Sequence, residues 1–331
     1  MGELETYCQG FKRALEPWPP LPQAEAADLV WWQELLATSA SGCLQGPTLL
    51  EALEAALPQL RLPQVSGISS SELYKRAVLR GQTPSAAELT AAGPGPHWQQ
   101  PQQLSLTLAP HSCGAMPVLR TPSQADFELL VRALAHRAEP VVLAHGVHAQ
   151  AISGLIHWGL IQRVNRQCRA RLIVLHDAPY GSVPAQHVPG APSDAAWLAA
   201  STTLRLEHEL THLATKHLLG EMRLNLLDEL IADCMGMVAA LGTFHSTLFG
   251  RCLGLGADGA PLPGGRWTTY VAQLKEKDAA QALTLTMQRA RELEAHLLRN
   301  PELLAPAQNL KLLTWLCQQR LDRPISPTKD R

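Results

Sequence analysis

Apolar residues recur every three or four positions through the first part of the chain, and prolines separate the segments that carry them. Such spacing places apolar side chains on one face of a helix. It predicts helices at residues 24–40, 47–60 and 69–81. The third segment begins with serines and ends with a glycine, as is usual at helix termini. We therefore expect residues 1–92 to form a helical N-terminal region.

The pattern changes after residues 93–103, a stretch rich in Gly, Pro and Gln that we interpret as a linker. Beyond it, alternating or continuous apolar runs predict three strands, at residues 104–110, 140–146 and 170–177. Helical spacing predicts helices at residues 125–138 and about 148–162. A few strands flanked by helices predict an α+β fold, and helices predominate over the whole chain.

Two consecutive helices follow. The first spans residues 193–220, with Ser193 as a candidate cap and Gly220 at its end, and the second restarts near Asn225. Two more helical stretches lie at residues 268–299 and 301–321. We therefore divide the rest of the chain into a core at residues 104–250, a C-terminal helical region at 251–322 and a flexible tail at 323–331.

The first of the two consecutive helices contains the sequence HELTH, in which His208 and His212 lie four positions apart. Residues at this spacing share one helix face, so two imidazoles on adjacent turns can direct nitrogens at one metal ion. Glu209 projects from the edge of the same face. There its carboxylate could hold a water molecule at the metal.

The second helix carries Glu229 and Asp233, also four positions apart, followed on the same face by Gly236 and Ala240. Small residues on that face predict a close approach to the preceding helix, and a short turn predicts an antiparallel hairpin. The hairpin would bring both acids to the two histidines. Because an unpaired buried carboxylate is costly, a divalent cation is one natural partner for them.

Ion pairs are the alternative partners for Glu229 and Asp233, and the neighbouring Asp228 has a separate explanation. Ion pairs with Arg205, Arg223 or Lys216 would account for one acid more easily than for both. Asp228 follows Asn225 by three residues, an arrangement typical of a helix N-terminus, so we assign Asp228 to capping.

The sequences HELTH and ELIAD, sixteen residues apart, resemble the gluzincin group of zinc metallopeptidases, whose thermolysin-like members pair HExxH with ExxxD on the next helix. The resemblance covers residues 208–233. It implies a zincin-like core of a small sheet and an active-site helix hairpin, with one Zn²⁺ per chain. It makes His208, His212 and Glu229 the zinc ligands, Glu209 the general base and Asp233 the carboxylate that orients a ligand histidine.

An oxyanion-stabilising or substrate-binding residue is also needed, and the motif does not identify it. The candidates by residue type are Tyr180, His217, Arg223 and His245. The resemblance further implies that the strand at residues 170–177 serves as the edge strand that aligns an extended peptide.

Composition narrows the class of protein. Hydrophobic residues make up 46% of the chain and charged residues 17%, which predicts a sizeable core rather than disorder. The formal net charge of −1 favours neither nucleic acid nor an anionic membrane as a partner. Seven dispersed cysteines without a C-x-x-C pair, together with the absence of a signal peptide, lead us to expect a cytoplasmic protein with reduced thiols.

The sequence thus leads to the hypothesis of a zinc-dependent metallohydrolase that cleaves amide bonds in a peptide or protein. Two alternatives remain: a non-catalytic, zinc-stabilised binding or regulatory module, and a metal-dependent amidase of a non-peptide substrate. An intact Glu209 favours catalysis, because a structural site needs no base there. The N-terminal helical region could gate or inhibit the site or bind a protein partner.

Overall fold

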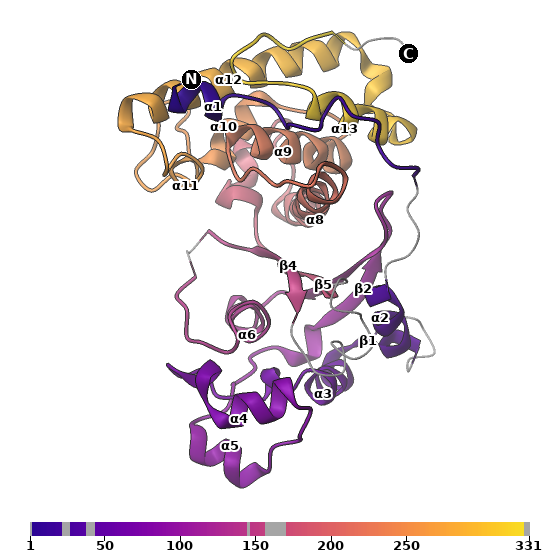
Figure 1. The fold of residues 1–331 in the computed structure, drawn as a ribbon. Helices are drawn as coiled ribbons and strands as arrows, with labels where there is room; N and C mark the ends of the chain where they lie inside the picture. Colours follow the sequence, from indigo (N-terminus) through magenta and orange to yellow (C-terminus); the bar gives the residue numbers. More distant parts are fainter. Residues whose placement is uncertain (1, 22–26, 38–43, 144–145, 156–169, 328–331) are drawn as a thin grey trace. The chain divides into compact units, whose positions relative to one another are not determined.

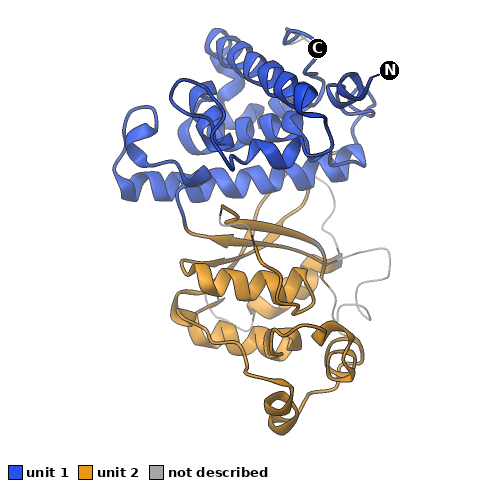
Figure 2. Cartoon of the chain, turned by 90° about the vertical axis from the view of Figure 1, so that its left-hand side faces the viewer, with its two compact units in different colours: residues 1–20, 178–331 blue, residues 21–177 orange. Residues whose placement is uncertain are grey.

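The computed structural model describes residues 2–21, 27–37, 44–143, 146–155 and 170–327. The chain forms two compact units (Figure 2). Unit 1 contains residues 1–20 and 178–331, and unit 2 contains residues 21–177. Unit 2 is therefore inserted into unit 1 near the start of the chain.

Unit 2 contains a mixed sheet of five strands in the order β1-β2-β3-β5-β4 (Figure 1). The parallel pair is β3 with β5, and the other neighbours are antiparallel. The strands are β1 (Leu44–Gln45), β2 (Ser105–Ala109), β3 (Met116–Thr121), β4 (Ala149–Leu155) and β5 (Ala170–His176). The fold is a mixture of helices and strands, as predicted.

Three helices pack against this sheet: α2 (Ala27–Ala37), α3 (Gly46–Ala56) and α6 (Gln124–Ala135). Their apolar side chains and those of the strands form one buried core, which includes Trp32, Leu49, Leu106, Phe127 and Val174. A smaller buried cluster surrounds α4 (Glu72–Tyr74) and the π-helical turn Lys75–Leu79, and α5 (Ala86–Ala92) packs against it through Leu89.

The stretch predicted as a linker is anchored within unit 2. The backbone N–H groups of Gln99 and Gln100 donate to the Asp126 carboxylate at 2.7 and 2.8 Å. Strand β1, which precedes this stretch in the sequence, also pairs with β2, which follows it. The unit boundaries near residues 20 and 178 therefore differ from those predicted at 93–103 and 104–250.

Two predictions around the sheet are wrong. Residues 140–143 form no strand, and Val142 is 88% exposed. The helix expected at about 148–162 is instead β4 over Ala149–Leu155, while residues 156–169 lie outside the described residues. Ile152 and Leu155 are both buried although they are three positions apart, because the register with β5 shifts between them. This irregularity imitates helical spacing in the sequence.

Strand β5 lies inside the sheet, between β3 and β4, and not at its edge. The expected role of residues 170–177 as an edge strand that aligns a peptide is therefore wrong. Both sides of β5 already pair with neighbouring strands, so its backbone groups are engaged in ladder hydrogen bonds.

Unit 1 is helical. Its helices are α1 (Glu3–Tyr7), α8 (Asp194–Leu219), α9 (Leu226–Leu241), α10 (Ser246–Leu253), α11 (Trp267–Tyr270), α12 (Glu276–Arg299) and α13 (Asn309–Cys317) (Figure 1). Every residue of α9 from Leu226 to Val238 is buried. A helix that is buried on all sides belongs to the core, and α9 contacts α8, α12 and α13.

Helices α8 and α9 form the predicted hairpin. The Ser193 hydroxyl accepts from Ala196 N at the start of α8, and Gly220 ends it with a φ of 73°. The Asn225 side chain caps α9 by accepting from Asp228 N. Gly236 brings the two helices together, because a Cβ atom there would lie 2.6 Å from the Leu204 carbonyl oxygen of α8.

The first ten residues are bound to the turn between α8 and α9. The Arg223 guanidinium donates to four backbone carbonyls, those of Thr6, Tyr7, Gln9 and Gly10. The Tyr7 hydroxyl accepts from Leu226 N at 2.9 Å and donates to the Tyr270 carbonyl at 3.1 Å. The N-terminal segment therefore holds the beginning of α9 in place.

No helix within the described ranges is long and apolar enough to cross a membrane. The described cysteines at positions 8, 113, 234, 252 and 317 are buried free thiols.

The contact at Gly236 leads to a stability prediction. Gly236→Ala should lower the free energy of unfolding by about 1–3 kcal/mol, because the new methyl group forces α8 and α9 apart. Gly→Ala inside a helix otherwise stabilises by up to about 1 kcal/mol. Denaturant unfolding followed by circular dichroism measures the change. The control is Gly95→Ala, where the added Cβ meets nothing within 4 Å. A stabilised Gly236→Ala protein would contradict the close approach.

Candidate metal centre

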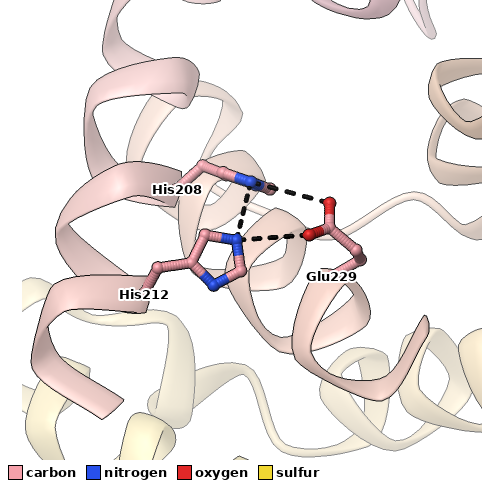
Figure 3. A group of neighbouring side chains, drawn as sticks. All are labelled: His208, His212 and Glu229. Carbon is pink, nitrogen blue, oxygen red and sulfur yellow. Dashed lines mark hydrogen bonds and ion pairs between the residues drawn. The ribbon is translucent and has the colours of Figure 1, made fainter. Parts of the chain in front are cut away.

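Three buried side chains converge between α8 and α9: His208, His212 and Glu229 (Figure 3). Nε2 of His212 lies 3.0 Å from Nε2 of His208 and 3.3 Å from Oε1 of Glu229. Nε2 of His208 lies 3.7 Å from Oε2 of Glu229. The exposed fractions of the three residues are 5%, 6% and 2%.

This arrangement fits a metal ion. Tetrahedral zinc with ligands at ~2.0–2.1 Å separates its ligand atoms by about 3.3 Å, within the range observed here. Two unprotonated imidazole nitrogens 3.0 Å apart repel one another, so a proton or a metal cation has to lie between them. These three residues could therefore hold a metal ion, and two imidazoles with one carboxylate are a donor set that zinc accepts.

The side of His208 away from this cluster is held by Asp233 and Tyr180. Nδ1 of His208 lies 2.7 Å from Oδ1 of Asp233, so Nε2 is the nitrogen that faces Glu229. The Tyr180 hydroxyl also donates to Oδ1 of Asp233. Burial, and then the charge of Asp233, raises the pKa of Tyr180 well above its usual value, so this hydroxyl keeps its proton. Asp233 thus lies beside the nitrogen of His208 that faces away from Glu229 and His212.

Asp228 has a second role that the sequence reasoning missed. Its Oδ2 accepts from the backbone N–H groups of Arg223 and Leu224, which agrees with a capping role. Its Oδ1 lies 3.4 Å from Nδ1 of His212. Each histidine therefore has a carboxylate of α9 beside its far nitrogen. A carboxylate in that position, when it accepts the ring N–H, fixes the tautomer of a metal-binding imidazole.

Charge at the site is balanced by protonation. Burial opposes a charge on His212, but the neighbouring carboxylates of Asp228 and Glu229 outweigh it and raise the pKa of His212 well above its usual value. Burial acts to raise the pKa of Glu229, yet the hydrogen bond to His212 and the charges of His208, His212 and Arg266 lower it to about 2. The raised pKa therefore favours a proton on His212 when no metal is bound.

Arg266 and Tyr270, at the start and end of α11, complete the surroundings of Glu229. Nη2 of Arg266 donates to Oε2 of Glu229 at 3.2 Å and to the Tyr270 hydroxyl at 3.0 Å. Neither residue could be predicted from the sequence. They lie more than thirty positions beyond Glu229, and no periodic pattern relates them to it.

One protein-family model matches this chain over residues 2–171 and 160–326, and its description is a family of unknown function, DUF7005. The chain belongs to this family. Neither a curated protein nor a solved structure matches it.

The other predicted site residues of the DUF7005 chain lie in different surroundings. The Tyr180 hydroxyl lies 2.9 Å from Nδ1, the far nitrogen of His208. Arg223 binds the N-terminal carbonyls described above. His217 is exposed near the end of α8, and His245 lies 3.7 Å from Glu294. Glu209 follows His208 on α8 and is partly exposed.

The pKa shifts predict how His212 contributes to stability at different pH. In the metal-free protein, its raised pKa stabilises the fold fully below the unfolded value of about 6.5, and the contribution is lost as the pH rises through the folded pKa. The lowered pKa of Glu229 stabilises the fold at pH values above about 4.3. That contribution to the free energy of unfolding is lost as the pH falls toward about 2. The pair therefore contributes most between about pH 4.5 and 6.5.

The measurement is the difference in unfolding free energy between wild type and His212→Gln, from about pH 4.5 to above pH 6.5, with a chelator present. This difference should decline above about pH 6.5. With excess Zn²⁺ it should instead grow with pH, since a metal requires neutral imidazole. His217→Gln, on the exposed face of α8, is the matched control. A difference that grows with pH in chelator contradicts the protonation assigned to His212.

Proposed function

We propose that this protein is a zinc-dependent metallohydrolase that cleaves an amide bond in a peptide or protein. The observation that carries the proposal is the buried group of His208, His212 and Glu229, together with Glu209 between the two histidines in sequence. The resemblance of residues 208–233 to gluzincins supports a peptide substrate and a zincin-like hairpin.

The protein's own residues would divide the work as follows. His208, His212 and Glu229 bind the metal. Asp233 accepts from Nδ1 of His208 and keeps Nε2 free to coordinate. A zinc ion bound here would lower the pKa of a water molecule and polarise the substrate carbonyl.

Glu209 is the candidate general base. Its side chain is partly exposed, whereas the neighbouring His208 is buried, so solvent can reach it. A carboxylate at this position would accept a proton from the attacking water and later donate it to the leaving amine. A purely structural metal site has no use for such a group, and this favours hydrolysis over the scaffold alternative.

The decisive experiment compares Glu209→Gln with wild type. Both proteins should bind about one zinc per chain, because Glu209 is not among the ligands. Hydrolysis of a peptide library should fall by about 10²–10⁴-fold in the variant, the usual contribution of general acid–base catalysis. Metal content is measured by elemental analysis, and cleavage by mass spectrometry.

Glu207→Gln is the matched control. Glu207 lies on the same helix next to His208 and is also partly buried, with burial raising its pKa to about 7. This variant should keep wild-type cleavage. Wild type that holds no metal when prepared without chelator contradicts the proposal. Zinc without hydrolysis of any peptide or amide supports the scaffold alternative instead.

A further inference from the structure

Arg266 reaches the candidate metal centre from the end of a closed loop. The loop follows α10 and runs from Gly254 to Gly265, which approach so closely that a Cβ on Gly254 would lie 2.4 Å from the Cα of Gly265. Gly254 adopts a φ of 91°, which favours glycine. Its carbonyl accepts from Leu262 N at 3.0 Å. Arg266 is the first residue after this closure, so its backbone position is fixed by the two glycines.

The guanidinium of Arg266 is held on several sides. Nη2 donates to Glu229 and to the Tyr270 hydroxyl, as described above, and Nη1 donates to the Cys252 carbonyl at 3.4 Å. The guanidinium carbon also lies 5.6 Å from the centre of the Tyr180 ring, within reach of a cation–π interaction. The side chain is 27% exposed. These contacts leave little freedom to the group.

Glu229 faces different partners through its two oxygens. Oε1 lies 3.3 Å from Nε2 of His212, inside the candidate metal centre. Oε2 accepts from Arg266 at 3.2 Å and lies farther, at 3.7 Å, from Nε2 of His208. A carboxylate oxygen bound to a guanidinium shares its charge with that cation and is the poorer metal ligand.

We propose that Arg266 is a positioning residue for Glu229, which holds Oε2 so that Oε1 alone is presented to the metal. This inference rests on the proposed metal centre. By engaging one oxygen, Arg266 keeps the carboxylate from binding through both and from rotating out of the site. It also offsets charge, because Asp228, Glu229 and Asp233 are together one negative charge more than a divalent cation neutralises.

The test is the binding of Co²⁺, a spectroscopic substitute for zinc, to metal-free wild type, Arg266→Gln, Arg266→Lys and Tyr270→Phe. Arg266→Gln should bind about 10–100-fold more weakly, as is typical when an outer partner of a metal ligand is lost. Its visible absorption should also change, since the spectrum reports the number and geometry of ligands.

Two milder variants should weaken Co²⁺ binding by smaller amounts. Arg266→Lys keeps the charge without the planar fork and should lie between wild type and Arg266→Gln. Tyr270→Phe removes the hydroxyl that Arg266 contacts, which also lies near Glu229, and should weaken binding by about 2- to 10-fold. Arg251→Gln is the control, because Arg251 donates to the His187 carbonyl and should leave Co²⁺ affinity unchanged.

Each outcome is decisive. Wild type that binds neither Co²⁺ nor Zn²⁺ contradicts the proposed function itself. Wild type that binds, beside an Arg266→Gln protein with equal affinity and an identical spectrum, overturns the role of Arg266 alone. The same holds if Arg266→Gln raises only the KM for a cleaved peptide, since Arg266 would then contact substrate. If Arg266→Gln fails to fold, wild-type affinity in both Arg266→Lys and Tyr270→Phe overturns the inference.

Discussion

The packing of unit 1 depends on three buried carboxylates of α9. Asp228, Glu229 and Asp233 have exposed fractions of 0%, 2% and 0%. A buried carboxylate is tolerated only when donors or cations compensate it. The compensating groups come from separate parts of the chain: two histidines of α8, the Tyr180 hydroxyl, the backbone N–H groups ahead of α9, and Arg266. Because the three acids are buried, polar groups from distant parts of the chain have to pack around them.

This arrangement requires α8 and α9 to approach closely. Gly236 allows it, since any larger residue there would meet the Leu204 carbonyl. The positive end of the α9 dipole also lies next to Asp228 and Glu229, which are in its first turn. Packing and electrostatics thus favour the same geometry, and neither Gly236 nor the acids have a purely local role.

Much of the candidate site could be predicted from the sequence because its signals are local. Four-residue spacings placed His208 with His212 and Glu229 with Asp233, and a capping asparagine and a terminal glycine located the helix ends. Other features left no such signal. Strand β3 was hard to recognise in the sequence because it contains Pro117, and proline is uncommon inside strands. The strand tolerates Pro117 because pairing with β5 begins one residue later, at Val118. Arg266 and the contact of Asp228 with His212 arise only from tertiary packing.

The insertion of unit 2 has a consequence for folding during synthesis. Domains generally fold as units as the chain emerges from the ribosome. Residues 21–177 are complete early, whereas residues 6–10 wait for Arg223, which lies 213 positions after Gly10. Glu229 and Arg266 emerge later still. Residues 6–10 therefore reach these native contacts later than residues 21–177 complete unit 2, and a metal ion could meet His208, His212 and Glu229 together only after residue 229 is synthesised.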